Sequence, residues 1–322
     1  MNKPKKRIVI FGGGSGTRPL LEGLSRQDGL EISVIVAMAD DGGSTGRLRR
    51  DLGIPPVGDI RSCLLSLAPG SDFKNALMHR FSDGDLTGHN AGNILLTALA
   101  QSGDLETGID ELAHMLNVTA QVIPVTLDDM VIVMNHGDQR TVGEDLISET
   151  NLDKPRKLTL QKSAQANKKA IEAIEKADLI ILSAGSLYES LISHFLVDGI
   201  KKAVSSSSLP LIYNCNITNK PGHTDGYTVQ DFVHEIESYL GKPLDAVTYH
   251  NKSIPEEMNP KKREQVIVSS RESGHTAYLG GDLLSNTRVE QQGHDAIKRA
   301  NLIHDPEALV NLILSYEAGD RS

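Results

Sequence analysis

The sequence predicts an α/β protein with a Rossmann-like, doubly wound and mostly parallel sheet that carries helices on both faces. Short Val/Ile-rich runs alternate with longer segments of 3.6-residue apolar period, which is the pattern of βαβ units. Runs such as "DLIILS" at 178–183 are apolar almost throughout, as strands buried on both faces are. The length of 322 residues suits one large domain, and we expect a single Rossmann-like domain over 1–322.

The predicted strands of the main sheet are rich in Val, Ile and Leu and are bounded by turn residues. In chain order they cover residues 7–11, 32–39, 121–125, 178–183, 209–215 and 246–249. The stretch "DDMVIVMNHGD" at 128–138 indicates part of a hairpin instead, because Asn-His-Gly-Asp follows an apolar run. We therefore expect a small β-containing insertion over 128–162.

Helix starts are predicted from capping residues. Ser163 precedes "AQANKKAIEAIEKA", Thr228 precedes "VQDFVHEIESYL", and Asp305, followed by Pro-Glu, opens "ALVNLILSYE". Thr141 and Glu144 have the spacing of a capping box. Further helices are expected to begin at Ser44 or Thr45, at a cap formed by Asp59, and after the loop at 87–93.

Composition and charge exclude several classes of function. A formal net charge of −9 argues against nucleic acid as the main partner, because affinity for its backbone comes from clustered Lys and Arg. The N-terminal "KPKKR" is followed by too few apolar residues for a signal peptide or a membrane span, so we expect a cytoplasmic protein without membrane insertion. The two cysteines, Cys63 and Cys215, form no C-x-x-C pair and are expected to be buried and reduced. The histidines lack metal-ligand spacing, and no metal site is expected.

The stretch "FGGGSGTRPL" at 11–20 places four glycines between a predicted strand and a predicted helix. Such a loop points free N–H groups and the positive end of a helix dipole at one spot, which favours phosphate binding. The dinucleotide pattern that starts at Gly12 is incomplete, because Thr17 stands where its last glycine belongs, and no Gly-Lys-Ser/Thr follows. A tight strand-to-helix turn is the structural alternative.

Four further loops have the same character: "ADDGGSTGRLRR" at 39–50, "TGHNAGN" at 87–93, "SAGSLYES" at 183–190 and "NCNITNKPGHTDGYT" at 214–228. The carboxyl ends of parallel strands meet at one edge of a sheet, so we expect these loops to gather there around a nucleotide diphosphate. The candidate ligand-binding residues are Gly12, Gly13, Gly14, Ser15, Gly16, Thr17, Asp41, Gly42, Gly43, Ser44, Arg47, His89, Asn90, Asn93, Gly185, Ser186, Tyr188, Asn214 and Asn216.

Asp40 and Asp41 are the candidate catalytic residues. Either carboxylate could bind ribose hydroxyls, hold a hydrated Mg²⁺ or orient an attacking hydroxyl, and a solvated turn is the alternative without function. Successive residues at a strand end point in opposite directions, so we do not expect both to face one ligand. Arg47 is preferred over its neighbours Arg49 and Arg50 as the cation that faces the site.

Taken in order, "GGGSG", "ADDGGSTGRLR" with "GIPPVGDIRSCL", "GHNAGN", "GSLY" and "NKPGHTDGYT" closely resemble the motifs of the YvcK-like gluconeogenesis factors, which are relatives of the CofD phospholactate transferases. The resemblance covers residues 7–320. It implies a Rossmann-like core with a ligand cleft at the glycine-rich strand ends. It also implies binding of a UDP-sugar such as UDP-N-acetylglucosamine and a role in cell shape and wall synthesis on gluconeogenic carbon sources.

The resemblance leaves the question of catalysis open. CofD relatives transfer a 2-phospholactyl group from a guanosine-activated donor to a deazaflavin alcohol, and Mg²⁺ would enter only with such a transferase activity. The "GGSTGRLRRDLGIPP" continuation is the gluconeogenesis-factor form, although Ala91 replaces an aromatic residue of that branch. We expect a nucleotide-sugar-binding regulatory protein whose partners include further copies of itself and cell-wall regulatory proteins. A Mg²⁺-dependent phospho-group transferase is the alternative, and a nicotinamide dehydrogenase fits the fold but lacks the complete fingerprint.

Overall fold

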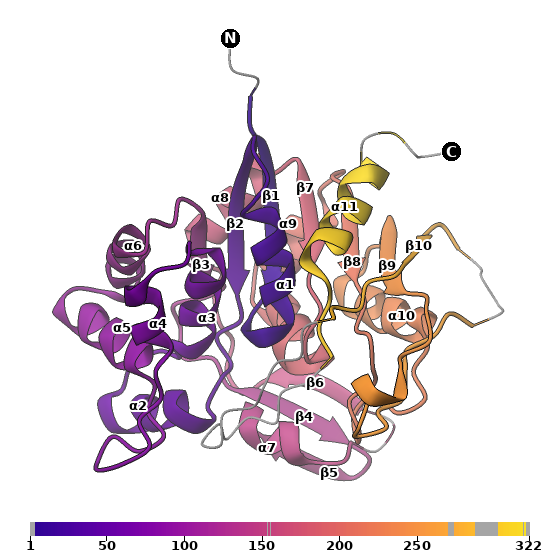
Figure 1. Ribbon diagram of the computed structural model, residues 1–322. Helices are drawn as coiled ribbons and strands as arrows, with labels where there is room; N and C mark the ends of the chain where they lie inside the picture. Colours follow the sequence, from indigo (N-terminus) through magenta and orange to yellow (C-terminus); the bar gives the residue numbers. More distant parts are fainter. Residues whose placement is uncertain are drawn as a thin grey trace.

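The computed structural model describes residues 4–152, 154, 156–269, 274–286, 302–317 and 319. Its main sheet has seven parallel strands in the order β10-β9-β8-β7-β1-β2-β3 (Figure 1). The strands are β1 (Lys6–Gly12), β2 (Leu30–Val36), β3 (Gln121–Pro124), β7 (Leu179–Leu182), β8 (Leu211–Asn214), β9 (Ala246–His250) and β10 (Ala277–Gly281). From β1 the chain proceeds outward to β3, then returns to β7 beside β1 and proceeds outward to β10. The topological switch point therefore lies between β1 and β7.

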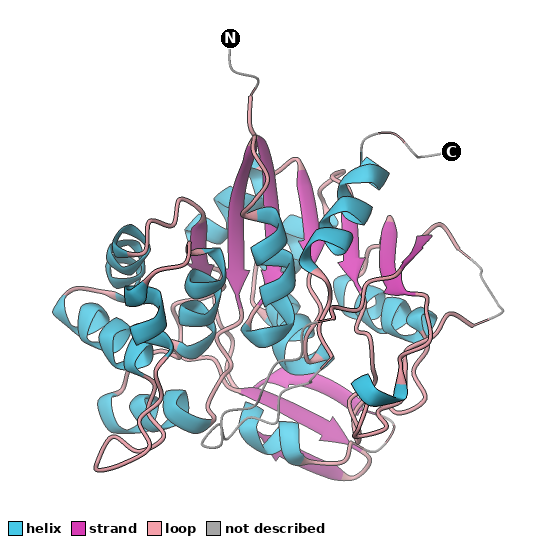
Figure 2. Cartoon of the chain, in the orientation of Figure 1, coloured by secondary structure: helices cyan, strands magenta, loops and turns pink. Residues whose placement is uncertain are grey.

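Helices cover both faces of this sheet (Figure 2). On one face α1 (Gly14–Leu24) packs against α3 (Gly58–Leu67) and α11 (Pro306–Glu317). On the other face α8 (Lys168–Lys176) packs against α9 (Ile200–Ser205), which also contacts α10 (Val229–Leu240). The middle strands β7 and β8 are consequently buried on both faces, which explains their unbroken aliphatic sequences. The predicted doubly wound fold is confirmed.

The long connection between β2 and β3 is helical. Besides α3 it contains α2 (Gly43–Leu52), α4 (Asp72–Met78), α5 (Ala91–Ser102) and α6 (Leu105–Met115). After β7 the chain forms a π-helical turn, η1 (Leu187–Leu191), and a 3₁₀ turn, η2 (Ile192–Leu196), and a second 3₁₀ turn, η3 (Glu256–Met258), follows β9. Within the described residues, none of the helices has the length and apolar character needed to cross a lipid bilayer.

A second, antiparallel sheet in the order β5-β4-β6 lies below the carboxyl ends of the main strands (Figure 1). It consists of β4 (Ile132–His136), β5 (Gln139–Val142) and β6 (Arg156–Leu160), with α7 (Glu144–Glu149) between the last two. It falls within the stretch where the sequence indicates a β-containing insertion. The Arg156 guanidinium lies 5.4 Å from the ring centre of Tyr188 and 5.2 Å from that of Tyr227, so it joins β6 to the body of the protein.

Several local predictions are confirmed. Thr228 caps α10 in a full capping box with Asp231, and Asp305 accepts the first N–H groups of α11. Cys63 and Cys215 are both buried and unpaired, and burial raises the pKa of the Cys215 thiol to about 12.

Other local predictions are wrong. The helix expected after Ser163 begins later, because Asn167 is the residue whose side chain accepts the Lys169 N–H. Thr141 forms no capping box, since it belongs to β5 and Gly143 with φ 96° precedes α7. Asp59 lies inside the first turn of α3 and is not its cap.

Candidate ligand-binding site

Two glycines of the first loop are required by close packing at the switch point. A Cβ atom on Gly12 would lie 2.0 Å from Ser183 Oγ, and one on Gly16 would lie 2.3 Å from the carbonyl oxygen of Ala184. The Thr17 hydroxyl lies 2.7 Å from Ser183 Oγ and accepts the Gly13 N–H at 2.8 Å. The bare backbone therefore lets the first turn of α1 contact the end of β7, and the Gly13 N–H is already used inside the loop.

The carboxylate of Asp59 lies directly beside the other two glycines. A Cβ atom on Gly13 would lie 2.5 Å from Asp59 Oδ2, and one on Gly14 would lie 3.1 Å from Asp59 Oδ1. Gly14 also has a positive φ of 60°, which favours glycine. The N–H groups of Gly14, Ser15 and Gly16 stand at the start of α1, where helix geometry provides no acceptor, and Ser15 is exposed. These three groups are the candidate donors of this loop to an anion.

The two acids of the second loop have different partners. Asp40 accepts the Gly42 N–H at 3.1 Å, and Asp41 accepts the Asp145 N–H of α7 at 2.7 Å. Asp41 thus holds α7 against the loop after β2, while Asp40 is directed toward the start of α2, as expected for successive residues. Burial raises the pKa of Asp40, nearby Asp41 and Asp145 raise it further, and hydrogen bonds from Thr45 and Gly42 oppose the shift. Gly42 precedes α2, and Gly43, its first residue, has a φ of 48°.

Glu144, the first residue of α7, extends this acidic region. Its pKa is raised well above the usual value, chiefly by burial and then by the charges of Asp40, Glu189 and Asp59. The region between the strand ends and α7 is therefore rich in carboxyl groups. Across the part of the chain that the structure describes, no three or more His, Cys, Asp or Glu side chains are grouped so that they could hold a metal ion.

The loop at 87–93 follows α4 rather than a strand, but it reaches the same edge through Ser44 at the start of α2. Ser44 Oγ lies 3.2 Å from His89 Nδ1 and accepts the Asn90 N–H at 3.4 Å and Asn93 Nδ2 at 3.3 Å. Asn90 also caps α5. Arg47 donates to the Thr87 carbonyl oxygen at 2.8 Å, so its guanidinium stabilises this loop. Burial, followed by the charge of Arg47, lowers the pKa of His89.

The loops after β7 and β8 are joined by a reciprocal pair of hydrogen bonds. Gly185 N–H donates to Asn216 Oδ1 at 3.2 Å, and Asn216 Nδ2 donates to the Gly185 carbonyl oxygen at 2.8 Å. Tyr188 and Asn214 are fully buried. The Tyr188 hydroxyl donates to Glu235 at 3.0 Å, and Asn214 Oδ1 accepts from Thr248 at 3.1 Å. As they lie, these two predicted site residues offer no surface to a ligand.

Sequence reasoning missed four charged groups near these loops: Asp59, Glu144, Glu189 and Lys220. The sequence predicts a helix cap at Asp59 and a capping box at Glu144. The available signal for Lys220 is a lysine within "NKPGHTDGYT", in the polar loop that follows β8. Nothing in the sequence indicates that Glu189 is buried.

Comparisons with known proteins agree with this architecture. Residues 8–298 match the model of the family described as 2-phospho-L-lactate transferase CofD. A putative gluconeogenesis factor of Thermotoga maritima is 38% identical over 311 residues, which cover 92% of this chain and 98% of that protein. The gluconeogenesis factor of Halalkalibacterium halodurans is 35% identical over 318 residues, covering 95% and 96%. A crystal structure of a UPF0052 family protein from Bacillus halodurans superimposes with a TM-score of 0.85 at 31% identity and covers 97% of this chain and 100% of that one.

Proposed function

The chain belongs to the gluconeogenesis factor family of CofD-like proteins, and from this premise we propose that it is a regulatory protein that binds a nucleotide-sugar. The proposed ligand is a UDP-sugar, with UDP-N-acetylglucosamine as the first choice. The proposed role links carbon metabolism to cell shape and cell-wall synthesis in the cytoplasm.

The observation that carries this proposal is the position of the loops at the switch point of a parallel sheet. In open α/β sheets, ligands bind outside the carboxyl ends of the strands where the strand order reverses. Here β1 and β7 flank that point, and Gly16 lies against Ala184 across it. The first-turn N–H groups of α1 and the exposed hydroxyl of Ser15 supply donors for phosphate oxygens.

The energetics require more than phosphate contacts. About four charge-assisted hydrogen bonds at roughly 1.5 kcal/mol each contribute about 6 kcal/mol. Micromolar affinity needs about 8 kcal/mol after an association cost of at least about 4 kcal/mol. The base and the sugar must supply the remainder, and the polar side chains of Asn216 and of the Ser44 cluster with His89, Asn90 and Asn93 are candidates for these contacts.

Thermal unfolding in the presence of nucleotides tests the proposal. A ligand at about ten times its Kd stabilises the folded state by about 1.4 kcal/mol. With an unfolding entropy of about 2.1 cal/mol/K per residue, this raises the Tm of a 322-residue chain by about 2 °C. UDP-N-acetylglucosamine should produce this shift, and GDP and NAD should produce less. An unchanged Tm at millimolar UDP-sugar would contradict the proposal.

A second candidate function, Mg²⁺-dependent transfer of a phosphorus-containing group, is favoured by the CofD match over residues 8–298. Asp40 or Asp41 would orient the acceptor hydroxyl in that case. Among the described residues, no three or more His, Cys, Asp or Glu side chains are grouped as metal ligands. Release of nucleotide that needs both an acceptor and Mg²⁺ would favour transfer, whereas UDP-sugar binding indifferent to Mg²⁺ and to Asp41→Asn would favour the regulatory role.

A further inference from the structure

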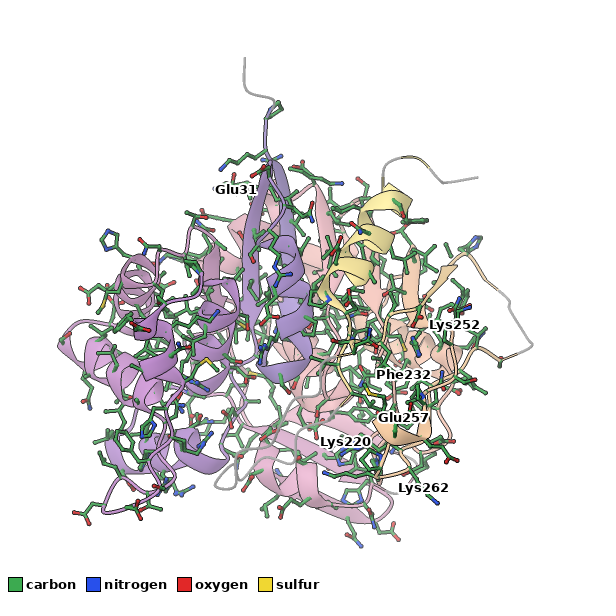
Figure 3. All side chains as sticks on the ribbon, in the orientation of Figure 1. Glu31, Lys220, Phe232, Lys252, Glu257 and Lys262 are labelled. Carbon is green, nitrogen blue, oxygen red and sulfur yellow. The ribbon has the colours of Figure 1, made fainter. Side chains whose placement is uncertain are left out.

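A lysine and a buried glutamate form an ion pair beside the switch point. Lys220 Nζ donates to Glu189 Oε1 at 2.7 Å, to Ser148 Oγ at 3.2 Å and to Ser186 Oγ at 3.4 Å. Lys220 comes from the loop after β8, Glu189 from η1 after β7, and Ser148 from α7. Figure 3 shows Lys220 where the loops below the main sheet approach the small sheet. The ammonium group therefore joins three segments that are distant in sequence.

Burial differs sharply between the two partners. The Glu189 side chain is 1% exposed, whereas the Lys220 side chain is 25% exposed. Holding a carboxylate out of water is costly unless a cation and hydrogen bonds compensate it. The buried carboxylate thus holds a lysine whose side chain is still partly exposed to solvent.

Among the described residues, one buried oxygen of this pair has no partner. Glu189 Oε2 is buried without a hydrogen-bond partner, and the buried ring of His223 lies beside it, with Nδ1 3.5 Å from Glu189 Oε1. Buried polar atoms in folded proteins are nearly always hydrogen-bonded, so an exception such as Glu189 Oε2 marks a place where a further polar group can bind. Glu189 also sits in a π-helical turn, a feature that is frequent at functional sites.

The position of the ammonium relates it to the glycine loop. Ser186, which Lys220 contacts, lies two residues beyond Ala184, and the Ala184 carbonyl oxygen is the atom against which Gly16 packs. The neighbouring carboxyl groups of Glu144, Asp40 and Asp59 disfavour an anionic ligand. An anion bound there needs a fixed cation, and a lysine held by a buried glutamate is a known arrangement for contacting nucleotide phosphates.

We propose that Lys220, held by Glu189, binds a phosphate group of the ligand at the switch point. This inference rests on the proposed function for the identity of the ligand, but the contact itself is with phosphate.

The test compares phosphate-containing and phosphate-free probes by calorimetry. Replacing Lys220 alone would leave Glu189 buried and unpaired, so the main variant is the double substitution Lys220→Met with Glu189→Gln, checked for an unchanged unfolding transition. It should bind UDP-N-acetylglucosamine and pyrophosphate about tenfold or more weakly, because a hydrogen bond to a charged group is lost. Uridine binding should be unchanged. Lys220→Arg should retain most of the affinity, and Lys176→Met, which removes an exposed Lys–Glu pair on α8, should behave as wild type.

The outcomes separate the two proposals. If wild type binds UDP-N-acetylglucosamine and the double variant binds it equally well, the inference about Lys220 is overturned and the proposed function stands. If wild type binds pyrophosphate in a Lys220-dependent manner but no UDP-sugar, the proposed function is overturned and the inference stands. If wild type binds neither probe, both are overturned.

Discussion

The substitution Gly16→Ala tests whether close contact between α1 and the end of β7 explains the glycine-rich loop. The added Cβ would lie 2.3 Å from the Ala184 carbonyl oxygen and 2.8 Å from Gly185 Cα. Both are backbone atoms, so no side-chain rotation relieves the overlap. Overpacking of this kind costs about 3 kcal/mol at the upper end of its range. The higher helix propensity of alanine offsets about 1 kcal/mol of this cost, so the free energy of unfolding should fall by about 2 kcal/mol.

Differential scanning calorimetry measures this loss. The unfolding entropy of a 322-residue chain is about 0.7 kcal/mol/K, so the net loss corresponds to a fall in Tm of about 3 °C. The matched control is Gly70→Ala, because a Cβ at Gly70 meets no atom within 4 Å. That control should change the free energy of unfolding by less than about 0.5 kcal/mol. A Gly16→Ala protein as stable as wild type would refute the packing explanation.

Three further predictions concern the region between the main sheet and the small sheet. Glu144 has a raised pKa in the folded protein, so the folded state binds the extra proton and stability falls as pH rises above about 4.5. In urea unfolding, Glu144→Gln should therefore be more stable than wild type at pH 8 and equal to it near pH 4, whereas the exposed control Glu149→Gln should follow wild type throughout. Arg156→Ala should lower the free energy of unfolding by about 1–2 kcal/mol, because it removes the guanidinium that stacks on two tyrosine rings. Amide hydrogen exchange in β4 and β6 should become faster, and unchanged exchange would contradict this prediction. Asp41→Asn should lower the stability of α7 by about 1 kcal/mol, because it weakens the hydrogen bond from the Asp145 N–H. Amide hydrogen exchange should become faster in α7 alone. Exchange as slow as in the wild-type protein would show that the Asp41 carboxylate does not hold α7 in place.

Local signals were sufficient to predict most of the main sheet. Aliphatic runs between turn residues identify six of its strands, and the capping box of Thr228 gives the start of α10 correctly. Strand β10 was missed because its sequence "AYLGG" ends in two glycines and is stabilised by pairing with β9. The second strand was predicted to reach residue 39 but ends at Val36, where its partner β1 ends at Gly12. The length of the neighbouring strand cannot be inferred from local pattern.

The candidate site was predictable as a set of loops but not as a set of contacts. Sheet topology alone brings the loops after β1, β2, β7 and β8 to one edge. Gly12 must be glycine because a Cβ atom there would overlap the hydrogen-bonded hydroxyls of Thr17 and Ser183. These two residues are 166 positions apart in the sequence. Tyr188 follows the same strand as Ser186, yet η1 turns it into the core, where it bonds Glu235. The direction in which each of these side chains points is set by tertiary packing, and it cannot be inferred from the spacing of residues in the sequence.

A crystal structure with UDP-N-acetylglucosamine tests the central claim most directly, namely that the switch point between β1 and β7 binds the diphosphate of a nucleotide-sugar. We expect the two phosphates to lie between the N–H groups of Gly14, Ser15 and Gly16 and the side chains of Ser186 and Lys220. A nucleotide bound away from this edge of the sheet, with the first turn of α1 uncontacted, would contradict the account.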